Sequence, residues 1–225
     1  MSYVAVQQVV SSLVRGRVLR PARRDIGSRA IDLSLGFLIL IFLLPMLIGI
    51  ALAIYVLEGR PVFFVQHRVG RGGNMFACFK FRSMAVDADA QLNRLLTRDA
   101  VARNEWARDH KLRRDPRITP LGAFLRRSSF DELPQIFNVL RGDMSLVGPR
   151  PIVQAEIPRY GRRFRHYCSV RPGITGLWQV SGRNDVSYRT RVAMDVIYAK
   201  RKRFLTDVWL ILLTIPAVLR RRGAY

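Results

Sequence analysis

Acidic residues are scarce in this sequence of 225 residues, where 16 Asp and Glu stand against 38 Lys and Arg. The resulting formal net charge of +22 is too extreme for an ordinary soluble surface and favours an anionic partner. That partner can be nucleic acid, anionic lipid or a phosphorylated ligand. No module that combines basic and aromatic residues in the RNA-binding manner accompanies the charge, so we expect no nucleic acid partner.

Cysteine and histidine are also rare. Cys78 and Cys168 provide no disulfide framework, which favours a reduced compartment that faces the cytosol. His67, His110 and His166 are scattered, and no His/Cys spacing predicts a zinc site. We interpret all five residues as structural. Internal repeats and low-complexity tracts are absent as well, and the length suits one domain with an appended element.

Charge is absent altogether between Leu33 and Leu57, a stretch long enough to cross a bilayer core of about 30 Å. The stretch begins too late and runs too long for a secretory signal peptide, and Glu58 to Pro61 do not form a small-residue cleavage site. Pro45 lies near its middle, removes one backbone hydrogen bond and predicts a kink.

Arginines flank this stretch on both sides. A helix that spans the membrane should carry its excess of Lys and Arg on one side only. A re-entrant helix–break–helix, which dips into the inner leaflet and returns, satisfies both flanks, so we favour it over a single span. The residues concerned are Arg15, Arg17, Arg20, Arg23, Arg24 and Arg29 before the stretch, and Arg60, Arg68 and Arg71 after it.

The rest of the chain predicts short elements. The apolar runs Val62–Gln66 and Met75–Phe81, joined by a Gly-rich turn, predict a hairpin near the membrane. Ala85–Leu96 has a helical apolar pattern, and the charged stretch from Thr97 to Asp115 predicts a surface helix or loop. Val208–Leu219 is too short to span a bilayer. Its basic ends fit an interfacial helix, with a buried core helix as the alternative.

Two adjacent carboxylates, Asp131 and Glu132, precede an apolar helical pattern that Gly142 terminates. Pro134 belongs in the first helical turn, so the pair lies at or beside the helix N-terminus, where anions are favoured. One carboxylate of such a pair can attack a substrate while the other holds a metal. The alternative is a capping box from Ser129 to Glu132.

Loops rich in Gly, Pro and Arg surround the carboxylate pair. Arg126 lies shortly upstream, and Arg150 is held between two prolines, a stiff mount that suits bidentate binding of phosphate. Further Gly-containing loops, Arg171–Gln179 and Ser181–Asn184, allow close approach of the backbone to a ligand. Together they indicate a site that handles phosphate groups.

Five ordered motifs closely resemble the bacterial sugar transferase family, the monotopic phosphoglycosyl transferases. The resemblance covers about residues 24 to 223, nearly the whole chain, and five motifs in order are far more specific than any one of them. One departure is Leu44 before Pro45, where the family often has Ser-Pro. The motifs are Phe79–Met84, Asp131–Gln135, Gly142–Ser145, Val147–Pro151 and Arg171–Gly176.

The resemblance implies an α+β, mainly α fold. Its parts are a basic N-terminal segment (1–32), a re-entrant membrane helix (33–57) and a cytoplasmic catalytic domain (58–225) with amphipathic interfacial helices and a small β-hairpin. Asp131 is implied as the nucleophile and Glu132 as a Mg²⁺ ligand, both catalytic. The substrate- and phosphate-binding residues implied are Arg126, Arg150, Lys80, Gln179 and Arg183.

The implied reaction moves a hexose 1-phosphate from a UDP-sugar to undecaprenyl phosphate, with UMP as the other product. It proceeds through a phosphosugar–Asp131 intermediate at the bacterial inner membrane; one-step direct transfer is the runner-up mechanism. The ending Gly176–Asp185 is most similar to transferases that start exopolysaccharide repeat units, which favours galactose, then glucose. The chain resembles the short forms of the family, without the extra N-terminal spans.

The expected partners are the UDP-sugar, undecaprenyl phosphate, anionic membrane lipid and downstream glycosyltransferases, and a homo-oligomer is left open. The rival from another class is a non-catalytic, membrane-tethered binder of anionic lipid or nucleic acid. It explains the charge and the apolar stretch, but it leaves the carboxylate pair and the Gly/Pro/Arg loops unexplained.

Overall fold

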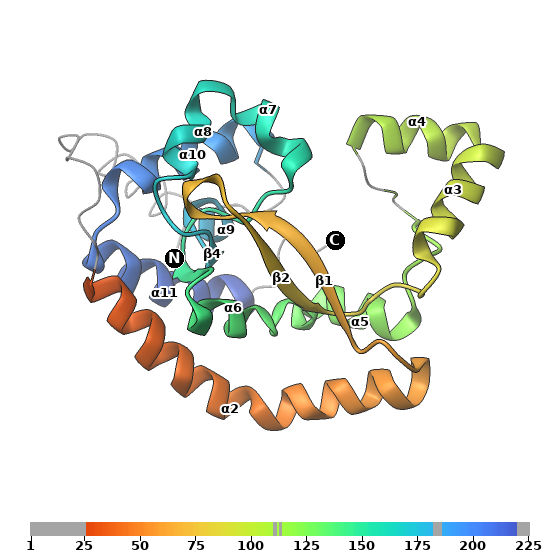
Figure 1. The fold of residues 1–225 in the computed structure, drawn as a ribbon, viewed down its shortest axis with the longest axis horizontal. Helices are drawn as coiled ribbons and strands as arrows, with labels where there is room; N and C mark the ends of the chain where they lie inside the picture. Colours follow the sequence, from red (N-terminus) through yellow and green to blue (C-terminus); the bar gives the residue numbers. More distant parts are fainter. Residues whose placement is uncertain (1–25, 110–111, 113, 182–185, 220–225) are drawn as a thin grey trace.

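The computed structural model describes residues 26–109, 112, 114–181 and 186–219 (Figure 1). The architecture is mainly helical with two small sheets, so the predicted fold class is confirmed. The helices are α2 (Ile26–Glu58), α3 (Ala88–Arg98), α4 (Ala100–Asp109), α5 (Pro120–Ser128), α6 (Gln135–Arg141), α7 (Ile157–Tyr160), α8 (Phe164–Tyr167), α9 (Leu177–Ser181), α10 (Tyr188–Arg201) and α11 (Phe204–Leu219). The strands are β1 (Phe63–Val69), β2 (Met75–Phe81), β3 (Ser145–Val147) and β4 (Gly173–Thr175).

Helix α2 contains the charge-free stretch and begins before it, at Ile26. The helix continues through Pro45, and Figure 1 shows it bending near its middle beneath the rest of the molecule. The predicted interruption is therefore a bend, because a proline removes only one hydrogen bond of the helix. Among the described residues, α2 is the one helix long and apolar enough to cross a membrane. Its exposed side chains include Phe37, Leu38, Ile41, Phe42, Ile48 and Leu52.

The N-terminal part of α2 is fastened to the folded domain by polar contacts. The guanidinium of Arg29 donates to the carbonyl oxygens of Val139 (2.7 Å) and Leu140 (2.8 Å) in the last turn of α6. Buried Asp32 accepts a hydrogen bond from the hydroxyl of Ser145 at 2.9 Å. These contacts connect α2 to α6, which ends just before the motif Gly142–Ser145, and to β3, which begins at its last residue.

The C-terminal end of α2 is fastened to the same domain. Nη2 of Arg82, directly after β2, donates to the carbonyl oxygens of Glu58 (2.8 Å) and Gly59 (3.1 Å). A cation placed there also interacts favourably with the negative end of the helix dipole. Both ends of α2 therefore contact one folded unit, and the helix lies along that unit.

The hairpin β1–β2 is antiparallel, as the sequence predicted, and β3 pairs with β4 in a separate parallel sheet. In the hairpin register, Phe64 pairs with Lys80, Gln66 with Cys78 and Arg68 with Phe76. Because side chains alternate across a strand, these six residues share one face of the hairpin. On the other face, the ring of Phe63 stacks on Phe81 at 5.4 Å between centroids.

The main core lies between α6, the two small sheets and the C-terminal helices, and it includes Ile136, Val139, Met144 and Leu210. Helix α11 buries Leu210 in this core while it exposes Leu205, Leu212 and Ile215. One side of α11 therefore belongs to the core, and the interfacial role of its exposed side stays a prediction. Helices α3 and α4 form an arm that stands apart from the main body (Figure 1).

Candidate active site

The carboxylate pair lies in a short turn between α5 and α6. Ser129 ends α5 in the left-handed conformation (φ 60°), and a 3₁₀ turn from Phe130 to Glu132 follows. Ser129 makes no side-chain capping bond, so the predicted capping box is not formed. Pro134 is the N-cap of α6 and Gly142 (φ 94°) ends it, which confirms that the pair precedes a helix that stops at this glycine.

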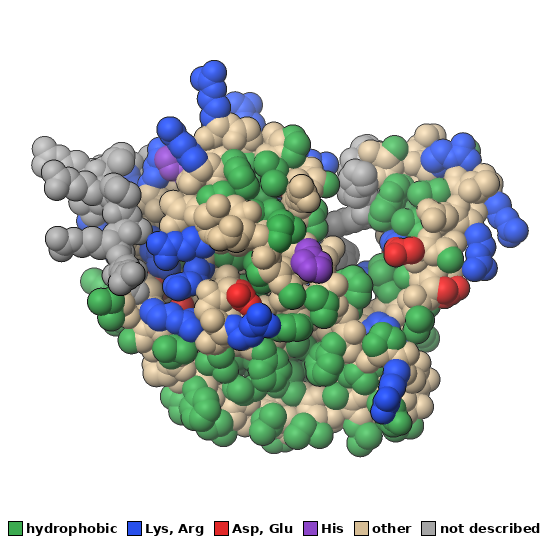
Figure 2. Space-filling model, viewed as in Figure 1, with side chains coloured by type: hydrophobic (Ala, Val, Ile, Leu, Met, Phe, Trp, Pro, Cys, Tyr) green, Lys and Arg blue, Asp and Glu red, His purple; other side chains and the backbone are tan. Residues whose placement is uncertain are grey.

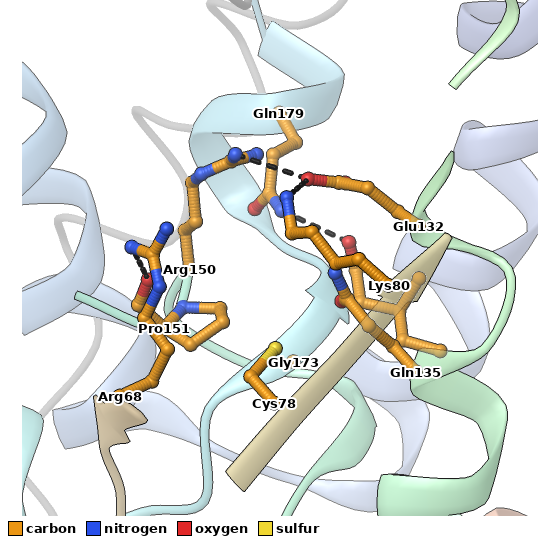
Figure 3. Close-up of a pocket in the computed structure, with 10 residues that line it drawn as sticks. Arg68, Cys78, Lys80, Glu132, Gln135, Arg150, Pro151, Gly173 and Gln179 are labelled. Atoms are coloured by element: carbon orange, nitrogen blue, oxygen red, sulfur yellow. Dashed lines mark hydrogen bonds and ion pairs between the residues drawn. The ribbon is translucent and has the colours of Figure 1, made fainter. Parts of the chain in front are cut away.

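Glu132 lies between two cations that come from distant parts of the chain. Nζ of Lys80, on β2, is 2.7 Å from Oε1 of Glu132, and Nη2 of Arg150 is 3.1 Å from the same oxygen (Figure 3). Nζ of Lys80 is also 4.0 Å from Oδ2 of Asp131. Lys80 therefore touches one carboxylate of the pair and lies close to the other.

The pKa values of the two carboxyl groups are shifted in opposite directions. Burial alone would raise the pKa of Glu132, but Arg150 and Lys80 outweigh it and lower the pKa to about 2. For Asp131, burial is the larger effect and raises the pKa above its ordinary value, although Lys80 opposes the shift. Glu132 is consequently fixed as an anion at neutral pH, whereas the charge of Asp131 depends on the nearby cations.

Arg126, on α5, is among the cations that act on Asp131: its positive charge lowers the pKa of that carboxyl group. Its Nε donates to the hydroxyl of Ser83 at 2.8 Å, which fixes the direction of the guanidinium. Helix α5 can approach this closely because residue 122 is glycine, and a Cβ there would collide with the backbone of Ser83.

A pocket opens beside the pair, and Figure 3 shows that Lys80, Glu132, Arg150 and Gln179 point toward it. The structure thus brings together four of the residues that the sequence singled out. Asp131 and Arg126 lie next to this group, and Arg183 lies outside the described residues. The remaining lining residues are Arg68, Cys78, Gln135, Pro151, Gly173 and Ile174.

Arg68 is a functional candidate that the sequence analysis missed. Its Nη1 donates to the carbonyl oxygen of Pro151 at 2.9 Å, and its Nε donates to the side chain of Gln66 at 3.1 Å. Burial and the nearby charge of Arg150 lower the pKa of Arg68. The alternation of polar residues along β1, with Gln66 and Arg68 two apart, is a signal that could have identified it.

Gln179 lies where the loop around Gly148 packs closely against the loop around Gly176. Its Nε2 donates to the carbonyl oxygen of Ile174 at 3.0 Å, while its Oε1 is buried and has no hydrogen-bond partner. A Cβ added at Gly176 would lie 2.6 Å from that Oε1 and would also collide with the carbonyl of Gly148. The glycine of this motif is therefore required by packing, beside the pocket.

Comparison with known proteins agrees with this geometry. The model of the family described as bacterial sugar transferase matches residues 23–221. The chain belongs to the bacterial sugar transferase family.

Three relatives illustrate the similarity. The undecaprenyl-phosphate galactose phosphotransferase of Salmonella typhimurium is 44% identical over 225 residues, and the UDP-galactose-lipid carrier transferase of Erwinia amylovora is 45% identical over 225 residues. Each match covers 100% of this chain and 47% of the relative, so the chain spans about half the length of these two. The exopolysaccharide production protein ExoY of Rhizobium meliloti is 42% identical over 207 residues, which cover 91% of this chain and 92% of ExoY.

The carboxylate oxygens of Asp131 and Glu132 are candidate ligands for Mg²⁺. Within the described ranges, no group of three or more His, Cys, Asp or Glu could enclose a metal ion. Mg²⁺ commonly binds through one or two carboxylates, several waters and the phosphates of a substrate. The adjacent carboxylates of Asp131 and Glu132 fit this mode, in which the substrate supplies the remaining ligands.

Proposed function

We propose that this sugar transferase moves a hexose 1-phosphate from a UDP-sugar to undecaprenyl phosphate, giving undecaprenyl diphosphosugar and UMP. The single observation that carries the proposal is the pair Asp131–Glu132 surrounded by Lys80, Arg126 and Arg150. A cluster of fixed cations beside a nucleophilic carboxylate suits the transfer of a phosphoryl group, whose charge must be stabilised. The names of the relatives support undecaprenyl phosphate as acceptor and favour galactose over glucose as the sugar.

The reaction proceeds in two steps. In the first, a carboxylate oxygen of Asp131 attacks the sugar-bearing phosphorus of the UDP-sugar, and the bond to the bridging oxygen breaks so that UMP leaves. In the second, a phosphate oxygen of the polyprenyl phosphate attacks the same phosphorus. The bond to Asp131 then breaks, and the carboxylate is regenerated.

The surrounding residues stabilise charge during these steps. Lys80 favours the ionised form of Asp131, which a nucleophile requires, and Arg126 acts on it in the same direction. Arg150 carries a guanidinium suited to phosphate oxygens, and Gln179 offers a free amide oxygen to a donor group of the UDP-sugar. Mg²⁺ held by Glu132 and the diphosphate would neutralise further negative charge.

The membrane helix supports a re-entrant arrangement at the inner membrane. Both ends of α2 contact the same folded domain, through Arg29 at one end and Arg82 at the other. A domain that stays on the cytoplasmic side would keep both ends there, with the bend at Pro45 inside the leaflet and the arginines on anionic lipid. The product would then be released where downstream glycosyltransferases can extend it.

Single cysteines test this topology in intact cells. Gly27→Cys and Gly72→Cys, in a background that lacks Cys78 and Cys168, should both resist a thiol reagent that cannot cross the membrane. Labelling of the first position alone from the periplasm would support a span instead.

A panel of UDP-sugars with detergent-purified protein and undecaprenyl phosphate tests the function. We expect release of UMP with UDP-galactose or UDP-glucose, and a sugar-labelled protein adduct when the acceptor is omitted. Asp131→Asn should fold and show neither. A non-catalytic binder would release no UMP from any donor. Full turnover without adduct or UMP exchange would favour direct transfer in one step.

A further inference from the structure

The shared face of the hairpin runs from the end of the membrane helix into the pocket. The strand β1 starts just after α2, so the pair Phe64–Lys80 is the one nearest to the helix. The pairs Gln66–Cys78 and Arg68–Phe76 follow in that order, farther along the hairpin. On this face, the hairpin residues follow one another away from the C-terminal end of α2. Lys80 lies in the pair closest to that end.

Beyond Lys80, toward the turn of the hairpin, polar side chains line the pocket. Arg68 and Cys78 line the pocket together with Arg150 and Gln179, so this side offers two guanidinium groups and a free amide oxygen. Such a set suits a diphosphate and the hydrogen-bonding groups of a nucleotide sugar.

Between Lys80 and the end of α2, the exposed side chains of the hairpin are apolar. Phe64, its cross-strand neighbour on the same face, is 50% exposed. Directly opposite side chains of an antiparallel pair have Cβ atoms about 4.5–5.5 Å apart. The side chain of Phe64 therefore begins next to that of Lys80, whose ammonium group contacts Glu132 and lies 4.0 Å from Asp131.

A second exposed ring lies on α5, the helix that precedes the turn with the carboxylates. Phe124 is 52% exposed, and its ring makes an edge contact with Phe130 at 6.1 Å between centroids. Phe130 immediately precedes Asp131, and it packs on the cluster that contains Leu47 and Ile54 of α2. This ring is thus connected to the reactive carboxylate on one side and to the membrane helix on the other.

The two rings continue the apolar surface of α2. Tyr55, Val56 and Leu57 at the end of the helix are exposed, and so are Phe63 and Val65 on the opposite face of β1 from Phe64. In Figure 2, hydrophobic side chains gather over the half of the molecule that contains α2. Exposed apolar side chains are therefore common between the end of α2 and the hairpin position of Lys80.

We propose that Phe64 and Phe124 hold the isoprenoid chain of the lipid acceptor, while Arg68 marks the opposite, nucleotide side of the same site. The assignment rests on the proposed function. A polyprenyl phosphate is apolar up to its single phosphate, and most of the exposed side chains between α2 and Lys80 are apolar, so the charges of ligand and protein coincide at the carboxylate pair. Each substrate reaches Asp131 from its own side, the UDP-sugar in the first step and the polyprenyl phosphate in the second.

Separate Michaelis constants test this assignment. Phe64→Ala should raise the KM for undecaprenyl phosphate by about three- to tenfold, the change expected when roughly half of a phenylalanine side chain loses its apolar contact. The KM for the UDP-sugar should stay unchanged. Phe64→Leu, which keeps apolar bulk, should lie close to wild type, and Phe124→Ala should behave like Phe64→Ala.

Two further variants complete the design. Phe204→Ala removes a ring that is 45% exposed on α11, and it should leave both constants unchanged because it alters only general contact with lipid. Arg68→Lys should raise the KM for the UDP-sugar alone. If Phe64→Ala raises both constants equally, or if Phe204→Ala matches it, the assignment is wrong. Absence of turnover in the wild type with every UDP-sugar would instead remove the proposed function and this assignment together.

Discussion

Nζ of Lys80 lies 2.7 Å from Oε1 of Glu132, although the two residues are 52 positions apart in the chain. The contact joins the hairpin to the turn that carries both carboxylates, and the same Nζ is 4.0 Å from Asp131. One side chain thus stabilises the ionised forms of the proposed nucleophile and of the proposed metal ligand.

Replacing Lys80 tests this double role. Lys80→Gln removes the charge, so the pKa of both carboxyl groups should rise and the ionised form of Asp131 should lose part of its stabilisation. A charge-assisted hydrogen bond contributes about 1.5–3 kcal/mol, and we therefore expect kcat/KM to fall by about tenfold to a hundredfold. Lys80→Arg keeps the charge and should lose less. Wild-type kinetics in Lys80→Gln would remove Lys80 from the site.

Arg150 is predicted to bind phosphate through its planar fork. Nη2 contacts Glu132 at 3.1 Å, and the following residue, Pro151, is held by Arg68 through its carbonyl oxygen at 2.9 Å. Arg150→Lys retains the charge but loses the bidentate geometry. We expect kcat/KM for the UDP-sugar to fall by about tenfold or more, measured as UMP release. An unchanged value would show that no forked contact forms.

The glycine at position 176 is predicted to be indispensable. Its added Cβ would collide with the carbonyl of Gly148 and approach the Oε1 of Gln179 to 2.6 Å. Gly176→Ala should therefore lower both the melting temperature and the activity. Gly49→Ala is the matched control, because no atom lies within 4 Å of a Cβ built there. Equal melting temperatures and activities of the two variants would contradict the close packing of Gly176 against Gly148 beside the pocket.

Buried Asp195 should make stability depend on pH. It accepts a hydrogen bond from Tyr160 at 2.7 Å, and burial raises its pKa to about 7, with Tyr160 and Arg191 opposing the shift. The stabilisation of a carboxyl group with a raised pKa is complete below the unfolded value near 4. It is lost as pH rises through about 7.

Asp195→Asn removes this titration and keeps an oxygen for the hydroxyl of Tyr160. Its melting temperature should exceed that of the wild type by a few degrees at pH 8, and the difference should shrink toward pH 4. A constant difference across this range would mean that Asp195 does not titrate there.

The sequence predicted most of the elements because their signals are local. The charge-free stretch predicted α2, and two apolar runs around a Gly-rich turn predicted the hairpin. The start of α2 at Ile26 was missed, because Ser28 and Asp32 become buried only through partners far away in the chain, such as Asp207 and Ser145.

The sequence identified most residues of the candidate site, but it did not predict how they contact one another. The motifs contained Lys80, Glu132 and Arg150, and the loop Arg171–Gln179 contained Gln179; the structure brings these four residues to one pocket. Arg68 stayed hidden because its contact with Pro151 crosses 83 positions and depends on how the hairpin packs. The alternation along β1 assigns Arg68 to one face of the hairpin, but it does not show which residues that face contacts.

The most direct test of the central claim follows the β-phosphate of the donor. Wild-type protein is incubated with undecaprenyl phosphate and UDP-galactose or UDP-glucose labelled with radioactive phosphorus at the β position. We predict that the label moves into the lipid fraction in an amount equal to the UMP released, and that Asp131→Asn abolishes both. Release of labelled UDP, with unlabelled sugar on the lipid, would contradict transfer of a hexose 1-phosphate.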